Sequence, residues 1–311
     1  MGMFKMKKWT VISMFSGCGG MDLGFIGGFS FLKYDYELNP FKIIWANEIN
    51  SAACKTYKVN IGIEIVEGDI REKIHSLPKS ADVIIGGFPC QDISINGKML
   101  GLEGLRSSLY KYMVEAVEIV RPKVFVAENV GGLLLKKNCN ALSKILSDFE
   151  RTDYNLHYSL YHAEDYGVPQ TRERVFIVGT RKDCPKFVPP TPTEISPVTA
   201  KEALQDLENM DEDKDFSHIW SKALVNGEQG NRKLVANRPG YTIRAECHGN
   251  IQFHYSLPRR ISMREAARIQ SFPDTFVFPC GLRETERQIG NAVPPVLSWH
   301  LANSVKRVLE G

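Results

Sequence analysis

Thr10-Val-Ile-Ser-Met-Phe-Ser-Gly-Cys-Gly-Gly-Met-Asp-Leu-Gly24 is the most informative stretch of the sequence. It predicts a strand, a glycine turn and a helix. Its β-branched and apolar beginning, residues 10–15, predicts a buried strand, and the residues after the glycines predict a helix over Met21–Gly28. The glycines at positions 17, 19, 20 and 24 suit a tight turn, because glycine lets the backbone approach a ligand closely and aim N–H groups at it. The same glycines could serve only to pack the helix tightly, so the turn leaves both interpretations open.

Alternating strand and helix patterns continue from this turn to about residue 180. Further strands are predicted at Lys42–Asn47, Ile63–Glu67, Ala81–Ile85, Lys123–Ala127, Tyr154–Tyr161 and Arg174–Gly179. Further helices are predicted at Ser51–Asn60, Ser107–Val120 and Asn140–Phe149. This alternation is typical of βαβ units and predicts an α/β fold with a mostly parallel sheet.

The pattern changes after residue 180. Cys184–Pro197 contains five prolines, which indicates a linker, and periodicity stays weak from there to about Pro258. Regularity returns at Ser262, whose capping box with Glu265 predicts a helix to about Phe272, and a last helix is predicted at Val296–Leu309. We therefore expect a first domain over residues 1–184, a loop-rich region over residues 185–258, and a return to the first domain over residues 259–311.

Composition narrows the classes of protein. The 311 residues (35.1 kDa) are 43% hydrophobic and 24% charged, which indicates a globular protein and excludes disordered and fibrous classes. The net charge of +3 provides no overall cationic field, although a local basic face remains open. The seven cysteines lie at least 33 residues apart, which excludes a Cys-x-x-Cys zinc pair. Their odd number disfavours a disulfide framework, so we expect reduced thiols, no metal and a cytoplasmic protein.

One segment has the length of a membrane span. Residues 11–32 carry a single charge, Asp22, but they also contain six glycines. A carboxylate in the middle of a bilayer is costly, so a strand, a glycine turn and a helix explain the segment better. The first eight residues lack the apolar core of a signal peptide, and we expect no membrane association.

Acidic residues follow the second and third predicted strands. Glu48 is followed by Ile49, and Asp69 is followed by Ile70. Carboxylates at successive strand ends can accept hydrogen bonds from ribose hydroxyls, and two of them suit a mononucleoside better than a pyrophosphate. The alternative is that both are ordinary surface carboxylates.

A cysteine follows the fourth predicted strand, in Asp82-Val-Ile-Ile-Gly-Gly-Phe-Pro-Cys-Gln-Asp-Ile-Ser94. Open α/β sheets bind ligands at the carboxyl ends of their strands, which is where Cys90 is expected. A loop at that edge presents a nucleophile well, although many cysteines are inert residues of the core. The next strand ends in Glu128-Asn-Val130, which adds a carboxylate at the same edge.

Six motifs in order along the chain resemble those of the DNA cytosine-5 methyltransferases of the bacterial modification type. They are Phe15-Ser-Gly-Cys-Gly-Gly20, Gly87-Phe-Pro-Cys-Gln91, Glu128-Asn-Val130, Gln170-Thr-Arg-Glu-Arg174, Arg264-Glu-Ala-Ala-Arg-Ile-Gln-Ser-Phe-Pro-Asp274 and Gln288-Ile-Gly-Asn-Ala-Val-Pro-Pro295. The resemblance implies a Rossmann-like methyltransferase sheet dependent on S-adenosyl-L-methionine (AdoMet). It also implies that the loop-rich region is a smaller target-recognition domain.

The resemblance also implies the chemistry. Cys90 would add to C6 of cytosine, so that C5 can attack the methyl group of AdoMet. Glu128 would be held protonated by a dry pocket and act at N3 of the base. Arg174 would contact O2 of the base, with Arg172 beside it. Because stacking covers the face that must be attacked, the base would be flipped out of the duplex.

Ligand contacts follow from the same resemblance. The implied AdoMet contacts are Phe15, Gly17, Cys18, Gly19, Gly20, Glu48, Ile49, Asp69, Ile70, Gly87, Pro89, Leu109, Asn291 and Ala292. The implied DNA contacts are Gln91, Ser94, Arg238, Thr242, Arg244 and His248, and the side chains of Asn250, Gln252 and His254 also suit DNA. Some relatives carry tryptophan at the position of Ile49, so an aliphatic contact with adenine is implied here.

The expected partner is double-stranded DNA, with a cognate restriction endonuclease acting on the same site. We expect a monomer in a prokaryotic cytoplasm. Three alternatives remain open from the residues alone: a tRNA cytosine-5 methyltransferase of the same fold, an enzyme with thymidylate-synthase-like chemistry, and a non-catalytic DNA-binding module derived from a methyltransferase.

Overall fold

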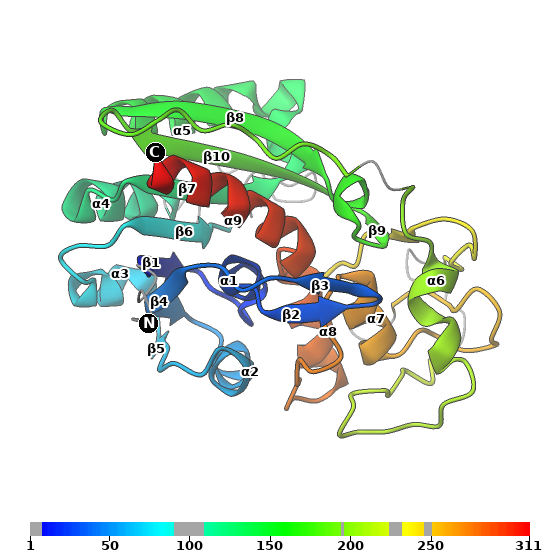
Figure 1. Ribbon diagram of the computed structural model, residues 1–311. Coiled ribbons are helices and arrows are strands. Elements are labelled where there is room, and N and C mark those ends of the chain that lie inside the picture. Colours follow the sequence, from blue (N-terminus) through cyan, green and yellow to red (C-terminus); the bar gives the residue numbers. More distant parts are fainter. Residues whose placement is uncertain (1–7, 90–108, 194–195, 224–231, 246–250) are drawn as a thin grey trace, which may run out of the picture.

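The computed structural model describes residues 8–89, 109–193, 196–223, 232–245 and 251–311 (Figure 1). Its strands are β1 (Trp9–Met14), β2 (Phe29–Phe31), β3 (Tyr34–Tyr36), β4 (Phe41–Glu48), β5 (Val66–Glu67), β6 (Val83–Gly87), β7 (Val124–Val130), β8 (Tyr154–His162), β9 (Gln170–Thr171), β10 (Glu173–Arg181) and β11 (Gly240–Tyr241). Its helices are α1 (Gly20–Ile26), α2 (Ser51–Ile61), α3 (Ile70–Lys73), α4 (Leu109–Val120), α5 (Cys139–Glu150), α6 (Ala200–Leu204), α7 (Met263–Ile269), α8 (Leu282–Asn291) and α9 (Pro295–Glu310).

The central sheet has seven strands in the order β5-β4-β1-β6-β7-β10-β8. The strands from β5 to β7 are parallel to their neighbours, whereas β10 runs antiparallel to both β7 and β8. The predicted α/β fold with a mostly parallel sheet is therefore confirmed. Because β4, β1, β6 and β7 point the same way, their carboxyl ends meet at one edge of the sheet.

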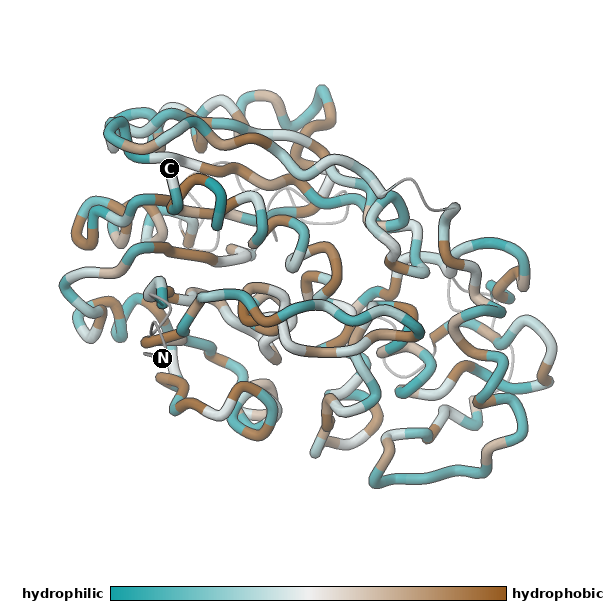
Figure 2. Tube along the Cα trace, in the orientation of Figure 1, coloured by the Kyte–Doolittle hydropathy of each residue, from teal (hydrophilic) through white to brown (hydrophobic). Residues whose placement is uncertain are grey.

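Helices cover both faces of the sheet, because successive side chains of each buried strand point to opposite faces. Val11 packs in a core with α1, α2 and α9, whereas its neighbour Ile12 packs in a second core with α3, α4 and α5. Figure 1 shows α9 crossing the first of these faces, and Figure 2 shows hydrophobic residues along the central strands. The last helix therefore packs beside α1 on this face.

The glycines of the first turn serve two purposes. A Cβ atom on Gly24 would lie 2.4 Å from the carbonyl oxygen of Pro295, and one on Gly20 would lie 2.5 Å from that of Val293. These two glycines let α1 lie directly against the start of α9. Gly17 and Gly19 instead have positive φ angles of 56° and 95°, which side chains rarely adopt. Packing and turn geometry, left as alternatives by the sequence, are both present.

The region after residue 184 is bound closely to the rest of the chain. Its strand β11 pairs in parallel with β9, and its helix α6 packs with α7 around a third core. The long loop after α6 is mainly hydrophilic (Figure 2). The capping box of Ser262 and Glu265 is present at the start of α7, which ends at Ile269, earlier than predicted.

Several short elements were not predicted: the β2–β3 hairpin, α3, α6 and α8. They lack a long apolar period, so the sequence pattern carries little signal for them. In the part of the chain that the structure describes, no helix is long and apolar enough to cross a membrane.

Candidate functional site

A pocket lies where the carboxyl ends of the parallel strands meet. It is lined by residues 13–17 at the end of β1 and in the turn after it, residues 20–22 of α1, Gly86 and Gly87 of β6, Glu128 of β7, and residues 291–293 at the end of α8 and after it. Of the predicted cofactor contacts, Phe15, Gly17, Gly20, Gly87, Asn291 and Ala292 line this pocket. Residues separated by more than 270 positions in the sequence are thus brought together at this edge.

Glu48, the last residue of β4, is connected to this pocket by hydrogen bonds. One carboxylate oxygen accepts a hydrogen bond from the backbone N–H of Gly17 (2.9 Å), and the other accepts one from Asn50 (2.8 Å). Burial raises the pKa of Glu48, although these hydrogen bonds oppose the shift. The neighbouring Ile49 side chain is 65% exposed, an unusual position for a large aliphatic residue beside a polar site.

The other predicted cofactor residues lie outside the lining of this pocket. Asp69 caps the N-terminus of α3 and pairs with Arg71, which lowers its pKa. The side chain of Cys18 is buried in the third core, where its thiol donates to the Gln288 carbonyl, and burial raises its pKa to about 12. Cys18 therefore contributes packing through its side chain. Five predicted cofactor residues remain. Gly19 lies in the turn, Ile49 is an exposed aliphatic residue, and Ile70 is buried at the start of α3. Pro89 is exposed, and Leu109 is the first residue of α4.

Glu128 and Arg174 form a buried ion pair at the ends of β7 and β10. Their side chains are 2.7 Å apart, and the residues are only 8% and 9% exposed. Burial raises the pKa of Glu128, while the positive charges of Arg174 and Arg172 oppose the shift. A Cβ atom on Gly87 would lie 2.6 Å from the Glu128 carboxylate, so only glycine leaves room for this carboxylate beside β6.

The ion pair lies between two pockets. Glu128 lines the pocket of the glycine turn, and Arg174 lines a second pocket with Gly131, Gly132 and Thr242. Thr242, a predicted DNA contact, comes from the loop-rich region, and its hydroxyl donates to the Thr171 carbonyl (2.6 Å). The two pockets can therefore hold one molecule on each side of Glu128, whose carboxyl group has a raised pKa.

Arg172 lines the second pocket together with Arg174, and its guanidinium also holds backbone from distant segments. The residue is 1% exposed, and its guanidinium donates to the carbonyl oxygens of Ile243 (3.0 Å), Gly290 (2.7 Å) and Ala292 (3.0 Å). These carbonyls belong to the loop-rich region and to the end of α8. Arg172 therefore holds the two segments together, and the sequence pattern did not reveal this because the acceptors are backbone atoms far away in the chain.

Asn129 is a positioning residue that the sequence analysis missed. Its side-chain amide donates to the Phe88 carbonyl (3.1 Å), and its side-chain oxygen accepts from the N–H of Val130. It therefore ties the end of β7 to the segment that precedes Cys90. The Glu-Asn-Val string contained this residue, but nothing in the string identified its partner. Five predicted residues lie outside the described ranges: Cys90, Gln91, Ser94, His248 and Asn250.

The predicted DNA contacts of the loop-rich region divide by exposure. Arg238 and Arg244 are exposed. The backbone at Arg244 lies against Gly290, where a Cβ atom would come within 2.6 Å of the Arg244 carbonyl carbon. Gln252 and His254 are buried, so the expectation that they suit DNA contact is wrong in this structure.

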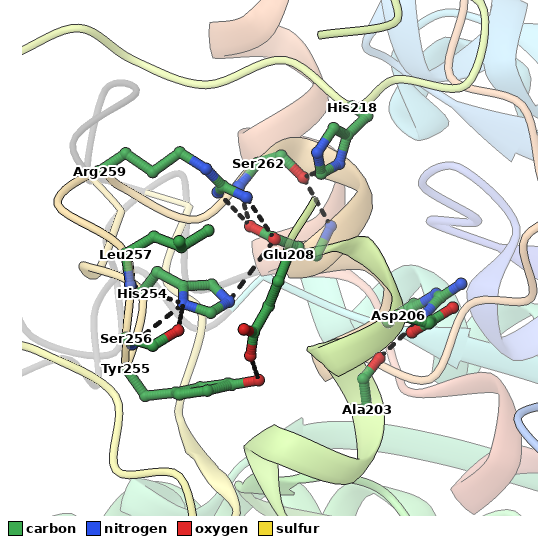
Figure 3. A network of polar contacts seen from close by, with 12 residues as sticks. Ala203, Asp206, Glu208, His218, His254, Tyr255, Ser256, Leu257, Arg259 and Ser262 are labelled. Atoms are coloured by element: carbon green, nitrogen blue, oxygen red, sulfur yellow. Dashed lines mark hydrogen bonds and ion pairs between the residues drawn. The ribbon is translucent and has the colours of Figure 1, made fainter. Parts of the chain in front are cut away.

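His254 belongs to a buried polar network that holds the start of α7 (Figure 3). Its Nδ1 accepts hydrogen bonds from the backbone N–H groups of Ser256 and Leu257. Glu265 is already paired by two hydrogen bonds from Arg259, of 2.7 and 2.8 Å. Burial lowers the pKa of His254, and it also lowers that of the neighbouring His218, which contacts Ser262.

The two buried histidines should make the protein sensitive to acid. Their pKa values are lower in the folded than in the unfolded chain, so the unfolded chain binds more protons and stability falls as the pH drops below about 6.5. We expect His254→Asn, whose side-chain oxygen can replace Nδ1 as an acceptor, to flatten this fall. Urea unfolding between pH 5 and 7 measures it. The exposed His75→Asn is the control, and identical pH profiles for all three proteins would contradict the expectation.

Comparison with known proteins identifies a protein family whose model matches most of this chain. A family model described as C-5 cytosine-specific DNA methylase matches residues 9–242 and 221–307. The type II methyltransferase M.NgoFVII of Neisseria gonorrhoeae is 38% identical over an alignment that covers 96% of this chain and 87% of that protein. The type II methyltransferase M.FnuDI of Fusobacterium nucleatum is 35% identical, with 96% and 94% covered.

Solved structures show the same fold at lower identity. The chain matches a putative DNA modification methyltransferase from an Escherichia coli prophage with a TM-score of 0.73 at 24% identity, covering 98% of this chain and all of that one. It matches a DNMT2 mutant of Spodoptera frugiperda with a TM-score of 0.68 at 16% identity, covering 96% and 99%.

Proposed function

The chain belongs to the C-5 cytosine-specific DNA methylase family and is a DNA cytosine-5 methyltransferase, and we propose how its residues perform the reaction and with which partners. The observation that carries the proposal is the buried Glu128–Arg174 pair between two pockets. Gly87, three residues before Cys90, pairs in register with Glu128 across β6 and β7. The candidate nucleophile thus follows the strand next to the candidate acid.

AdoMet is the methyl donor in this proposal, and the groups in and beside the first pocket suit its parts. The pocket combines the backbone of a glycine turn with Glu48, which suits a ribose, and the exposed Ile49 beside it suits an adenine face. When bound, AdoMet supplies an electrophilic sulfonium methyl group. Residues 13–17 and 291–293 would hold its amino-acid end close to Glu128. Asp69, which caps α3, would contact the cofactor from the far side of β4.

The second pocket would receive the cytosine. The thiolate of Cys90 would add to C6, and C5 would then take the methyl group from AdoMet, whose methyl–sulfur bond would break to leave S-adenosylhomocysteine. Glu128 donates a proton toward N3 as negative charge develops on the ring, and Arg174 stabilises the same charge through O2. A base then removes the C5 proton, and elimination releases the Cys90 thiol. Stacked bases hide C6, so the cytosine must leave the duplex first.

Two residues would position this machinery through hydrogen bonds to backbone carbonyls. Asn129 fixes the segment before Cys90 through the Phe88 carbonyl, and Arg172 fixes the backbone near Thr242 and Asn291. Their hydrogen bonds use backbone acceptors, so they set geometry and carry no chemistry of their own.

The exposed Arg244 is our candidate for reading the DNA sequence. Its backbone is anchored against α8, which gives its side chain a defined starting point near the second pocket. Arg244→Ala is expected to reduce discrimination between the cognate duplex and single-substituted duplexes by about 5- to 100-fold, the range for a bidentate arginine–guanine contact. Affinities measured at fixed salt test it. The exposed Arg307→Ala on α9 is the control, and unchanged discrimination by Arg244→Ala would move recognition elsewhere.

We further propose that the protein works as a monomer on double-stranded DNA in a prokaryotic cytoplasm, as the modification partner of a restriction endonuclease that cuts the same site. Support comes from relatives named type II methyltransferases at 32–38% identity over nearly the whole chain. Their similarity favours DNA over tRNA as the substrate. None of the described residues that line the second pocket favours tRNA specifically.

One experiment tests the proposal. Purified protein is incubated with AdoMet and either mixed-sequence duplex DNA or bulk tRNA, and 5-methylcytosine is mapped by bisulfite sequencing. We expect methylation of one cytosine within a short recurring DNA sequence and none on tRNA. Methylation confined to tRNA would overturn the choice of substrate, and methylation at scattered cytosines would overturn sequence-specific modification.

A further inference from the structure

Asp22 is a buried carboxylate that the proposed chemistry does not use. It lies on α1 and is fully buried. One oxygen accepts a hydrogen bond from the Tyr57 hydroxyl (2.7 Å), while the other, Oδ2, has no partner in hydrogen-bond geometry, although the nearby Ser13 side chain helps to lower the pKa of the carboxyl. Within the described ranges, no lysine, arginine or histidine forms an ion pair with Asp22. A buried carboxylate with an unsatisfied oxygen is costly unless something completes its interactions.

The position of Asp22 indicates which kind of group completes the interactions of its carboxylate. Asp22 lines the same pocket as Gly17, Glu128 and Asn291. Burial raises its pKa to about 6, so it is mainly ionised at neutral pH and carries a negative charge next to the space that the ligand would fill. A cationic hydrogen-bond donor in the pocket would offset the cost of burying this charge.

We propose that Asp22 binds the primary ammonium group of the methyl donor's amino-acid moiety. The inference rests on the proposed use of AdoMet. AdoMet carries two cationic groups, and only the ammonium has N–H donors that can satisfy an oxygen lacking a hydrogen bond. The sulfonium carries the methyl group, which must face the cytosine, and it has no N–H donor to offer Asp22. Asp22 thereby selects ligands with a free α-amino group.

Tyr57 acts through Asp22 as a positioning residue. Its hydroxyl occupies one carboxylate oxygen and leaves the other directed to the ligand, while its ring packs beside Gly19, within 3.1 Å of where a Cβ atom would lie. Removing the hydroxyl leaves the charge in place. Tyr57→Phe should therefore weaken ligand binding much less than loss of the carboxylate charge.

The test is calorimetric binding of S-adenosylhomocysteine, the demethylated product, and of its analogue lacking the amino group. Wild type is expected to bind the amino compound at least about tenfold more tightly than the analogue. Asp22→Asn keeps an acceptor for Tyr57 but removes the charge, and it should weaken binding of the amino compound by about 10- to 100-fold, as expected for a charge-assisted hydrogen bond. The affinity for the analogue should stay within about twofold of wild type.

The remaining outcomes separate this inference from the proposed function. Equal loss of affinity for both ligands in Asp22→Asn, or equal affinity of wild type for both, would overturn the role of Asp22. Failure of wild type to bind AdoMet or S-adenosylhomocysteine at all would overturn the proposed cofactor instead. Because Asp22→Asn removes an uncompensated buried charge, the ligand-free variant should unfold at or above the wild-type temperature. If the variant does not fold, the wild-type comparison of the two ligands still decides.

Discussion

Cys90→Ser should reduce methyl transfer by about a thousandfold or more, an increase of roughly 4 kcal/mol in the activation free energy. A serine hydroxyl is a far weaker nucleophile than a thiolate at neutral pH, so C6 addition becomes the barrier. AdoMet binding should stay within about threefold of wild type, because most residues of the first pocket come from other strand ends. Tritium transfer from labelled AdoMet to duplex DNA measures turnover, and calorimetry measures binding.

Covalent trapping gives the same prediction an independent readout. Duplex DNA with 5-fluorocytosine at the target position should form a complex with wild type that survives denaturation, because fluorine cannot leave as the C5 proton does. Cys90→Ser should form none. The exposed Cys139→Ser on α5 is the matched control and should trap as wild type does. Turnover of Cys90→Ser above a tenth of wild type would remove Cys90 from the mechanism.

Glu128→Gln should lower kcat by about 100- to 1000-fold, the usual cost of losing one preorganised donor at a site of developing charge. Glutamine has nearly the same shape but cannot transfer a proton, so N3 would lose its acid. Burial raises the pKa of Glu128, which favours the protonated form that the proposed acid requires. Single-turnover methylation with saturating DNA measures the chemical step.

The ion pair complicates the interpretation of Glu128→Gln, so the folding and DNA binding of the variant are measured as controls. Glu128→Gln leaves the buried Arg174 without its carboxylate partner, which can cost stability. Thermal unfolding and DNA affinity are therefore measured on the same samples. A variant that folds and binds DNA but methylates slowly supports the acid role. Turnover within about threefold of wild type contradicts it, and the exposed Glu118→Gln on α4 should change nothing.

The sequence alone predicted the sheet and most of its helices. Strands such as Val83–Gly87 are continuous apolar runs, and α4 carries apolar residues at helical spacing, so local pattern suffices. The order of six motifs identified the family, which the comparisons confirmed. Glu48, Gly87 and Glu128 lie at the carboxyl ends of parallel strands, which meet at a single edge of the sheet, whereas Arg174 reaches the same edge from the start of the antiparallel β10.

Only the tertiary structure decided which of these polar residues touch one another. That Arg172 holds three backbone carbonyls, that His254 and Gln252 are buried, and that one oxygen of Asp22 lacks a partner depend on contacts between residues far apart in the chain. The sequence by itself determined the fold class, the family and the residue types at the sheet edge, because periodicity and motif order are local properties. The roles of individual side chains needed the structure, because burial and hydrogen-bond partners are set by how distant segments pack.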